Sequence, residues 1–397
     1  MIRSQGPSPV TYTILASRAI YSMFWVILAP IYTVIGSSIG IPSIDYGLIS
    51  WAFILGAGIF QIPSGILTAR VNAQYVYMMG LAILASSIFL TAGANSLIVL
   101  LLSRVIGGIG AAMFFSSAGY VLEAINSKHL GLYMGFYNAA FSAGAGIGLL
   151  WAVVYRIIFW RVALVLAGLI GIAFVALDYL SWARRPEVGV ERANLKNLKG
   201  TLLNHRVILL AIMVSGFWGA NYAAETLLPS YFTLSRHLSP LLGSYLTSIM
   251  LFSSLPGGFA NVIYDRIKRG ELLLFGAGGL VAVSFLLFET GSMGTVIGLI
   301  VMGFSSTIVF SSFYSLSLDY ADRQNGAIVL ALINTLNMAI GMWISPVFSI
   351  IENYALPALW PTMAAITLVP LIPLLVMKKP KTHHQSDRKR DHFDPMS

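Results

Sequence analysis

The 397-residue sequence contains no cysteine, which excludes disulfide bonds, thiolate metal sites and cysteine-based chemistry. Charged residues make up only 10% of the chain, against roughly 25% in an ordinary soluble domain. The sequence also lacks a G-x-x-x-x-G-K-[ST] motif, so it gives no support for direct use of ATP. No clustered carboxylate pair or Ser/His/Asp arrangement indicates an enzyme. We therefore expect no enzymatic activity, no cofactor and no bound metal.

Long apolar runs are what the chain has in abundance, and 57% of its residues are hydrophobic. Runs of about 20 residues recur from Thr11 to Met377, each long enough to cross a hydrocarbon core of about 30 Å. The first run, of about 25 residues, is too long for the core of a signal peptide. These features predict an all-α, multi-pass protein of the cell membrane, embedded in the lipid bilayer and without a nucleic-acid partner.

Hydropathy and helix-breaking residues together predict twelve transmembrane helices. The first six are expected at residues 11–35, 46–69, 74–93, 97–124, 130–154 and 161–183. The second six are expected at residues 206–230, 240–263, 271–289, 293–318, 326–350 and 356–377. An even number of crossings places both termini on the same side of the membrane.

Basic residues are distributed unevenly between the two sides of this topology. One side has only Arg156, Arg161 and Arg236, while Arg104 falls inside a predicted helix. The other side collects most of the rest, in the linker between the halves, in the C-terminal tail and at Arg3, Arg18, Arg70, Lys128, Arg266, Lys268, Arg269 and Arg323. Under the positive-inside rule this asymmetry predicts that both termini are cytoplasmic.

The two halves of the chain are related by an internal repeat. A constant offset of 196 residues aligns Gly47 with Gly243, Arg70 with Arg266, Gly107 with Gly303, Phe114 with Phe310, Glu123 with Asp319, and Asn138 with Asn334. Because each half holds six helices, both halves have the same orientation in the bilayer. This predicts two six-helix bundles related by a pseudo-two-fold axis along the membrane normal.

The repeat also sets the expected domain boundaries. Residues 1–183 form the first bundle and residues 206–377 the second. The polar segment 184–205 is the expected cytoplasmic linker, and residues 378–397 form a basic cytoplasmic tail that we expect to be disordered.

Short motifs extend this picture. The loop after the second helix has Gly65, Leu67 and Arg70, with Ala69 and Asn72 at the remaining positions of a G-x-L-x-D-R-x-G pattern. The fourth helix contains an R-x-x-x-G-x-G pattern that begins at Arg104, in "RVIGGIG". With these motifs the chain resembles the major facilitator superfamily of secondary transporters over essentially its whole length.

The resemblance implies a role for five charged residues at the cytoplasmic ends of helices. Charges at such positions form interhelical latches that hold the cytoplasmic side closed in one state. The candidate gate residues are Arg70, Glu123, Asp265, Arg266 and Asp319. The alternative is that these charges lie in solvated loops and only set the topology.

The resemblance also implies that helices 1, 4, 7 and 10 line a central cavity. Arg104 is expected about 13 Å below the outer, non-cytoplasmic surface of the membrane. Glu225 is the acid in the outer part of those helices. Arg104 would bind an anionic substrate or adjust the protonation of Glu225; the alternatives are a static charge pair or an arginine that caps backbone carbonyls. Further candidates are Asn221, Tyr222, Trp218, Trp25, Asn138, Asn334 and Asn337, for which interhelical hydrogen bonding or packing is the alternative.

We therefore expect a secondary transporter that moves a small solute by alternating access, preferably a small organic anion. Coupling to a proton or another ion is left open, and a monomer is expected. One alternative is a drug or lipophile exporter of the same superfamily. The glycine-rich "GAGIG" at Gly144 to Gly148 favours it, since it resembles a pattern of drug and proton antiporters. Leu149 weakens it, because that pattern continues into a proline. The other alternative is a membrane sensor or scaffold that does not transport.

Overall fold

The computed structural model describes residues 8–126, 130–183, 200, 203–259, 269–320 and 326–376. Within these ranges the chain is helical and contains no β-strand. Eleven described segments are long and apolar enough to cross a membrane. The predicted all-α, multi-pass fold is confirmed. Most of the expected linker and all of the expected tail lie outside the described residues.

The first half contains eight α-helices and two short 3₁₀ segments, η1 (Ala29–Ile31) and η2 (Ser43–Asp45), in its described part. The α-helices are α1 (Pro9–Val26), α2 (Tyr32–Ile39), α3 (Tyr46–Arg70), α4 (Ala73–Ala92), α5 (Leu97–Ile125), α6 (Leu130–Leu150), α7 (Ala152–Ile157) and α8 (Trp160–Ala183).

The second half is described in the same way. Its α-helices are α10 (His205–Leu234), α11 (Pro240–Ser253), α13 (Gly270–Leu287), α14 (Ser292–Asp319), α15 (Gly326–Gly341), α16 (Ile344–Tyr354) and α17 (Leu359–Leu368). Its 3₁₀ segments are η4 (Leu255–Phe259), η6 (Leu356–Ala358) and η7 (Val369–Val376).

Several predicted helices are interrupted. The helix expected at 11–35 divides into α1, η1 and α2, because Pro30 has no N–H to donate and cannot continue the helix. The helices expected at 130–154 and 326–350 each end in a separate short helix, α7 and α16. The helix expected at 240–263 is described as α11 and η4, and its remaining residues lie outside the described ranges.

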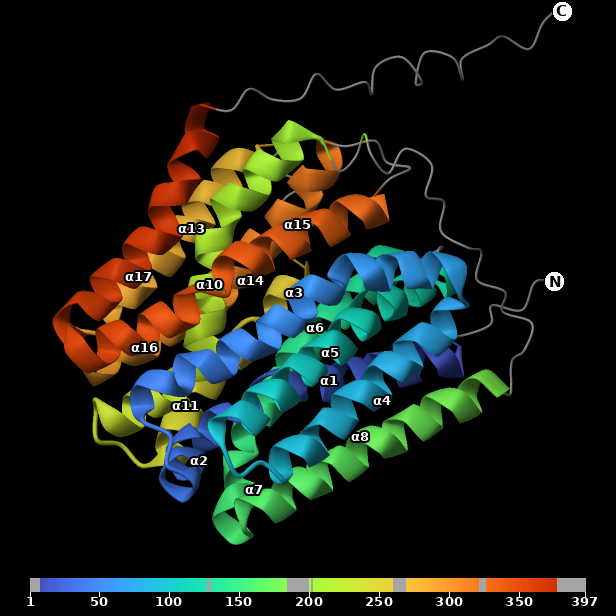
Figure 1. Ribbon diagram of the computed structural model, residues 1–397. Coiled ribbons are helices and arrows are strands. Elements are labelled where there is room, and N and C mark those ends of the chain that lie inside the picture. The colour runs from blue at the N-terminus through green and yellow to red at the C-terminus, as the bar shows by residue number, and fades with distance from the viewer. Residues whose placement is uncertain are drawn as a thin grey trace, which may run out of the picture.

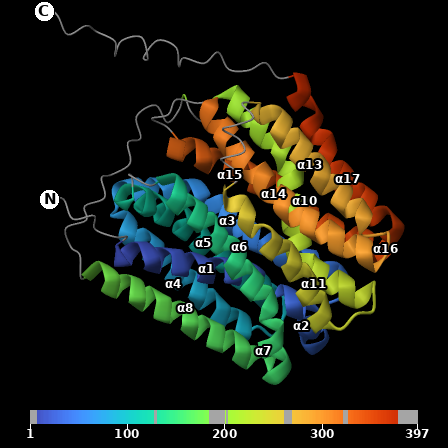
Figure 2. The same cartoon turned by 180° about the vertical axis from the view of Figure 1, so that it is seen from behind.

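The helices form two bundles that repeat one packing scheme (Figures 1 and 2). In the first bundle α1 packs on α6, α3 and α4 on α5, and α4 on α8. In the second bundle α10 packs on α15, α11 and α13 on α14, and α13 on α17. Between the bundles α3 packs on α15, while its counterpart α11 packs on α6. This reciprocal exchange is what a pseudo-two-fold axis produces, so the predicted two-bundle arrangement is confirmed.

The glycines of the "RVIGGIG" motif allow the helices of the first bundle to approach closely. A side-chain carbon on Gly108 would collide with the backbone carbonyl oxygen of Phe53 on α3. One on Gly110 would lie 2.5 Å from the backbone nitrogen of Leu84 on α4. A side-chain carbon would be too close to the neighbouring backbone at both positions. For this reason α5 needs glycine where it crosses α3 and α4.

The halves meet tightly at the end of the molecule opposite the end of α8 and the start of α10, which we call the far side (Figure 1). There the Ser43 hydroxyl donates to the Asn353 side-chain oxygen at 2.7 Å, and the Gly47 N–H donates to the Ser349 hydroxyl at 3.0 Å. A side-chain carbon on Gly47 would lie 2.7 Å from the Cα of Pro346. Both of these hydrogen bonds therefore join neutral groups.

Candidate functional site

The interruption of α1 positions the first candidate residue, Arg104 on α5. The break leaves backbone carbonyls near the end of α1 without the usual helical donors. The Arg104 guanidinium donates to the carbonyl oxygen of Phe24 at 3.3 Å and to that of Trp25 at 3.1 Å. This is the geometry of the backbone-capping alternative. A cation at a helix C-terminus also interacts favourably with the helix dipole.

Arg104 is almost completely buried, with 1% of its surface exposed. Its guanidinium carbon lies 4.2 Å from the centre of the Phe53 ring, and its Nε has no hydrogen-bond partner among the described residues. The Tyr155 hydroxyl donates to the carbonyl oxygen of Ile27 at 3.0 Å. Arg104 and Tyr155 together stabilise the interrupted segment.

Glu225 lies on α10 within a short polar chain. The Asn221 side-chain amide donates to a Glu225 carboxylate oxygen at 2.7 Å, and the Ser306 hydroxyl of α14 donates to the Asn221 side-chain oxygen at 2.7 Å. Glu225 is 8% exposed, and no described cationic side chain forms an ion pair with it. Ser306 was not expected from the sequence, because a serine within an apolar helix has no pattern that distinguishes it from its neighbours.

Tyr222 links the two charged candidates across the interface between the halves. It interacts electrostatically with both Arg104 and Glu225. Its hydroxyl donates to the carbonyl oxygen of Ser50 on α3 at 3.3 Å, so it also joins α10 to the first bundle. The structure thus brings Arg104 and Glu225 into one neighbourhood through Tyr222.

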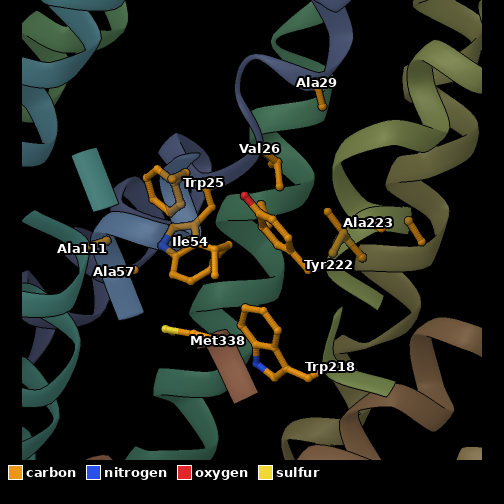
Figure 3. Packing of buried hydrophobic residues seen from close by; sticks show 14 of the residues in the cluster. Trp25, Val26, Ala29, Ile54, Ala57, Ala111, Trp218, Tyr222, Ala223 and Met338 are labelled. Atoms are coloured by element: carbon orange, nitrogen blue, oxygen red, sulfur yellow. The ribbon is translucent and has the colours of Figure 1, made fainter. Parts of the chain in front are cut away.

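Aromatic rings fill the centre of the interface (Figure 3). The Trp25 ring meets that of Tyr222 edge-on, with centroids 5.9 Å apart, and Tyr222 stacks on Trp218 at 5.8 Å. Trp25 also contacts Phe53 at 4.9 Å and Phe141 at 5.9 Å. The predicted aromatic candidates Trp25, Tyr222 and Trp218 therefore lie together.

The three asparagine candidates have different environments. Asn138 is half-buried on α6. Asn334 is buried on α15, and its side-chain oxygen accepts from the Tyr314 hydroxyl at 3.1 Å. Asn337 is wholly buried, and neither its side-chain oxygen nor its nitrogen has a hydrogen-bond partner in the described part of the chain. Asn334 has the predicted interhelical bond, whereas Asn337 does not.

The gate candidates are only partly described. Arg70 ends α3 and Glu123 lies in the last turn of α5, and both side chains are exposed. Among the described residues no hydrogen bond or ion pair joins them. Asp319 is exposed at the end of α14. Asp265 and Arg266 lie outside the described residues.

The position of Arg18 differs from the surface position that the sequence predicts for it. It is expected at the cytoplasmic surface, but the structure places it nine residues inside α1 with 4% of its surface exposed. The sequence suggests a surface charge because Arg18 is near the start of the first predicted helix. The structure shows that this expectation is wrong, since the side chain is buried. The available signal was its place within the apolar run "ILASRAIYSMFWV".

The fold and these contacts can be compared with known proteins. The sequence model of the Major Facilitator Superfamily matches residues 14–346 of this chain. The chain belongs to that superfamily. It is therefore a multi-pass membrane transporter and not an enzyme, as the sequence predicts.

Three relatives illustrate the breadth of this superfamily. The nitrite extrusion protein of Bacillus subtilis is 23% identical over 290 residues, which cover 73% of this chain and 72% of that protein. The quinolone resistance protein NorA of Staphylococcus aureus is 30% identical over 127 residues, 31% of this chain and 33% of NorA. An uncharacterized MFS-type transporter of Methanocaldococcus jannaschii is 30% identical over 122 residues, 30% of this chain and 32% of the relative. The last two matches thus span about a third of each relative.

The fold of this superfamily member also matches a solved structure. The human organic anion transporter MFSD10 (TETRAN) superposes with a TM-score of 0.70, covering 93% of this chain and 100% of that chain. The sequences are 16% identical, so the likeness shows a shared fold.

Proposed function

We propose that this transporter moves small organic anions by alternating access between its two bundles. The observation that carries the proposal is the charge buried near the interface. Two guanidinium groups, of Arg18 and Arg104, lie there, and neither forms an ion pair with a described carboxylate. Buried charges need partners of opposite sign, and a net positive site favours an anion. The nitrite extrusion protein and the human organic anion transporter, to which this chain is similar, are both named for the transport of anions, which supports an anionic solute.

We assign different roles to the two central charged residues. Arg104 supplies positive potential at the interface while it holds the interrupted α1. Glu225 is our candidate carrier of a coupling proton, because a carboxyl group can take up and release a proton. This carboxyl group accepts a hydrogen bond from Asn221 and interacts electrostatically with Tyr222. Asn138, Asn334 and Asn337, with Trp25, Trp218 and the polar side chains of α10, are the candidate contacts for the solute.

Replacing Glu225 with glutamine tests the proton role. The amide keeps the size of the carboxyl group but cannot exchange a proton. In proteoliposomes, uptake of radiolabelled benzoate driven by a pH gradient is expected to fall about a hundredfold or more, the lower end of what a positioned proton-transfer group contributes. Exchange of benzoate at equal pH is expected to continue.

The matched control is Glu289→Gln, since Glu289 is exposed just after α13. It should leave both uptake and exchange unchanged. Unaltered pH-driven uptake in the Glu225 variant would remove Glu225 from the coupling mechanism.

We infer that residues 1–183 and 206–377 are the moving units, joined by 184–205, with both termini in the cytoplasm. The cytoplasmic gate would then consist of Arg70, Glu123, Asp265, Arg266 and Asp319, which would pair when that side closes. The hydrogen bonds that join the halves at the far side support a mechanism in which the two sides close in turn.

Orientation can be measured because the chain has no cysteine of its own. A cysteine introduced at Ser386 in the tail is expected to resist an impermeant maleimide in intact cells and to react after permeabilisation. One introduced at Ser239, before α11, should react in intact cells. The reverse pattern would invert the proposed topology.

Drug export is the second candidate function, supported by the similarity to the quinolone resistance protein. It predicts that a quinolone is transported and that benzoate is not. A scaffold without transport predicts no movement of anions, sugars, amino acids or lipophilic cations in the same proteoliposomes.

A further inference from the structure

Arg18 lies in the middle of a group of aromatic rings from three helices. Its guanidinium carbon is 4.3 Å from the ring centre of Tyr137, 4.6 Å from Tyr21, 4.9 Å from Phe141 and 5.0 Å from Phe115. We call these four rings and Arg18 the Arg18 cage. Cation–π attraction to several rings stabilises the charge and fixes its position.

The Arg18 cage lacks a hydrogen-bond acceptor for most of what Arg18 can donate. Its Nε and Nη1 atoms are buried without a partner among the described residues. Nor does any described carboxylate form an ion pair with Arg18. Aromatic faces attract a cation but cannot accept the in-plane hydrogen bonds of a guanidinium group as an oxygen does. A buried, positively charged donor without an acceptor is costly, so the cage is chemically incomplete.

The Arg18 cage reaches the second bundle. Tyr314, half-buried on α14, interacts electrostatically with Arg18 through its hydroxyl. That hydroxyl donates to the Asn334 side-chain oxygen on α15, and the Tyr314 ring stacks on Phe310 with centroids 6.4 Å apart. The unpaired charge therefore lies within electrostatic range of the second bundle, and a solute site in an alternating-access transporter lies between the two halves.

Arg104 and Arg18 differ in this respect. Arg104 already donates to two backbone carbonyls near the aromatic layer of Trp25 and Tyr222. Arg18 lies one to two helical turns nearer the start of α1 than Phe24 and Trp25. It donates no hydrogen bond to a described backbone carbonyl from its Nε or Nη1 atom. Arg18 therefore has more unfilled donor atoms, Nε and Nη1, than Arg104, which lacks a partner only at Nε.

We propose that the Arg18 cage binds the carboxylate of an organic anion with an aromatic body. Two carboxylate oxygens match the planar fork of an arginine, and they would approach its edge because the rings cover its faces. The aromatic body of the ligand would then pack against the surrounding rings. This proposal rests on the proposed function, since it names the residue that recognises the anion.

Calorimetric titration of the purified full chain with benzoate tests the cage, with benzamide as the neutral ligand of the same shape. The wild-type protein is expected to bind benzoate at least about tenfold more tightly than benzamide. Arg18→Gln should weaken benzoate binding by about 30-fold or more and leave benzamide binding little changed, as expected for loss of a charge-assisted bidentate pair. Phe115→Leu should weaken both ligands.

Arg161→Gln is the matched control, because Arg161 also stacks on an aromatic ring, at 4.4 Å from Trp160, but lies outside the interface. It should bind benzoate as the wild type does. If Arg18→Gln does not purify as a monodisperse protein, Arg18→Lys provides the test. Lysine keeps the charge but loses the fork, so about tenfold weaker binding is expected.

The outcomes separate the two proposals. Benzoate binding that is unchanged in the Arg18 variants, or equal to benzamide binding in the wild type, overturns the cage. Failure of the wild type to bind benzoate while another organic anion is transported also overturns the cage as described and leaves the proposed function standing. If no anion is transported in proteoliposomes, the proposed function fails, whatever the calorimetry gives.

Discussion

Replacing Gly47 with leucine will separate the two bundles at the far side of the membrane. The added side chain would collide with the carbonyl group of Ser345 and with Pro346, which are backbone atoms of α16 and cannot rotate away. Overpacking of this kind costs about 1–3 kcal/mol. A bias of that size shifts an equilibrium between two states by about 5–150-fold. The population of the closed far side should therefore fall relative to the open one.

The separation can be measured by double electron–electron resonance between spin labels, since no native cysteine has to be removed. Labels at Ser38 and Tyr354, which are exposed on opposite bundles at the far side, should show a longer and broader distance distribution in the Gly47→Leu variant. Gly276→Leu is the matched control, because a side chain at Gly276 meets nothing within 4 Å. An unchanged distance in the Gly47 variant would mean that α3 and α16 adapt locally.

Replacing Arg104 with leucine is expected to destabilise the first bundle by about 3 kcal/mol or more, since each hydrogen bond from a charged donor contributes roughly 1.5–3 kcal/mol. The substitution would remove two such bonds and leave the carbonyls of Phe24 and Trp25 without a donor. Thermal unfolding in detergent measures the loss, and hydrogen exchange should increase near the break in α1. Arg156→Leu, at an exposed arginine, should change neither.

The same variant separates the two roles considered for Arg104. A stable Arg104→Leu protein that no longer binds benzoate would favour direct contact with the anion. A destabilised protein in which the surviving folded fraction binds benzoate with normal affinity would favour the capping role. A stable protein with normal binding would contradict both.

The sequence predicts the fold well because hydropathy records which helices cross the bilayer, and the 196-residue offset records the repeat. It does not predict how the repeat departs from symmetry. Pro30 and Pro229 occupy related places in the two halves, yet α1 breaks at its proline while α10 continues through Pro229 to Leu234. Arg104 and Tyr155 donate to backbone carbonyls at the break in α1, and they lie near it only in the folded protein.

The candidate site shows the same limit. Glu225 and Asn221 are four residues apart on one helix, so their contact follows from helical spacing. The environment of Arg18 does not, because its rings come from α1, α5 and α6 and only tertiary packing brings them together. From sequence alone, a charged residue near the end of a predicted helix is assigned to the surface. Its burial is found only when the positions of the neighbouring helices are known. The gate charges depend further on the conformational state, which a sequence does not specify.

The neutral contacts at the far side have an electrical consequence. Moving one elementary charge through a membrane potential of 100 mV changes the free energy by about 2.3 kcal/mol. The groups that join the halves there, Ser43 with Asn353 and Gly47 with Ser349, carry no charge, and neither does the neighbouring contact of Trp51 with Trp343. Parting them transfers no charge across the field. Membrane voltage would then act on this protein through its solute and its ionisable groups, such as Glu352 near Tyr46, and not through these contacts.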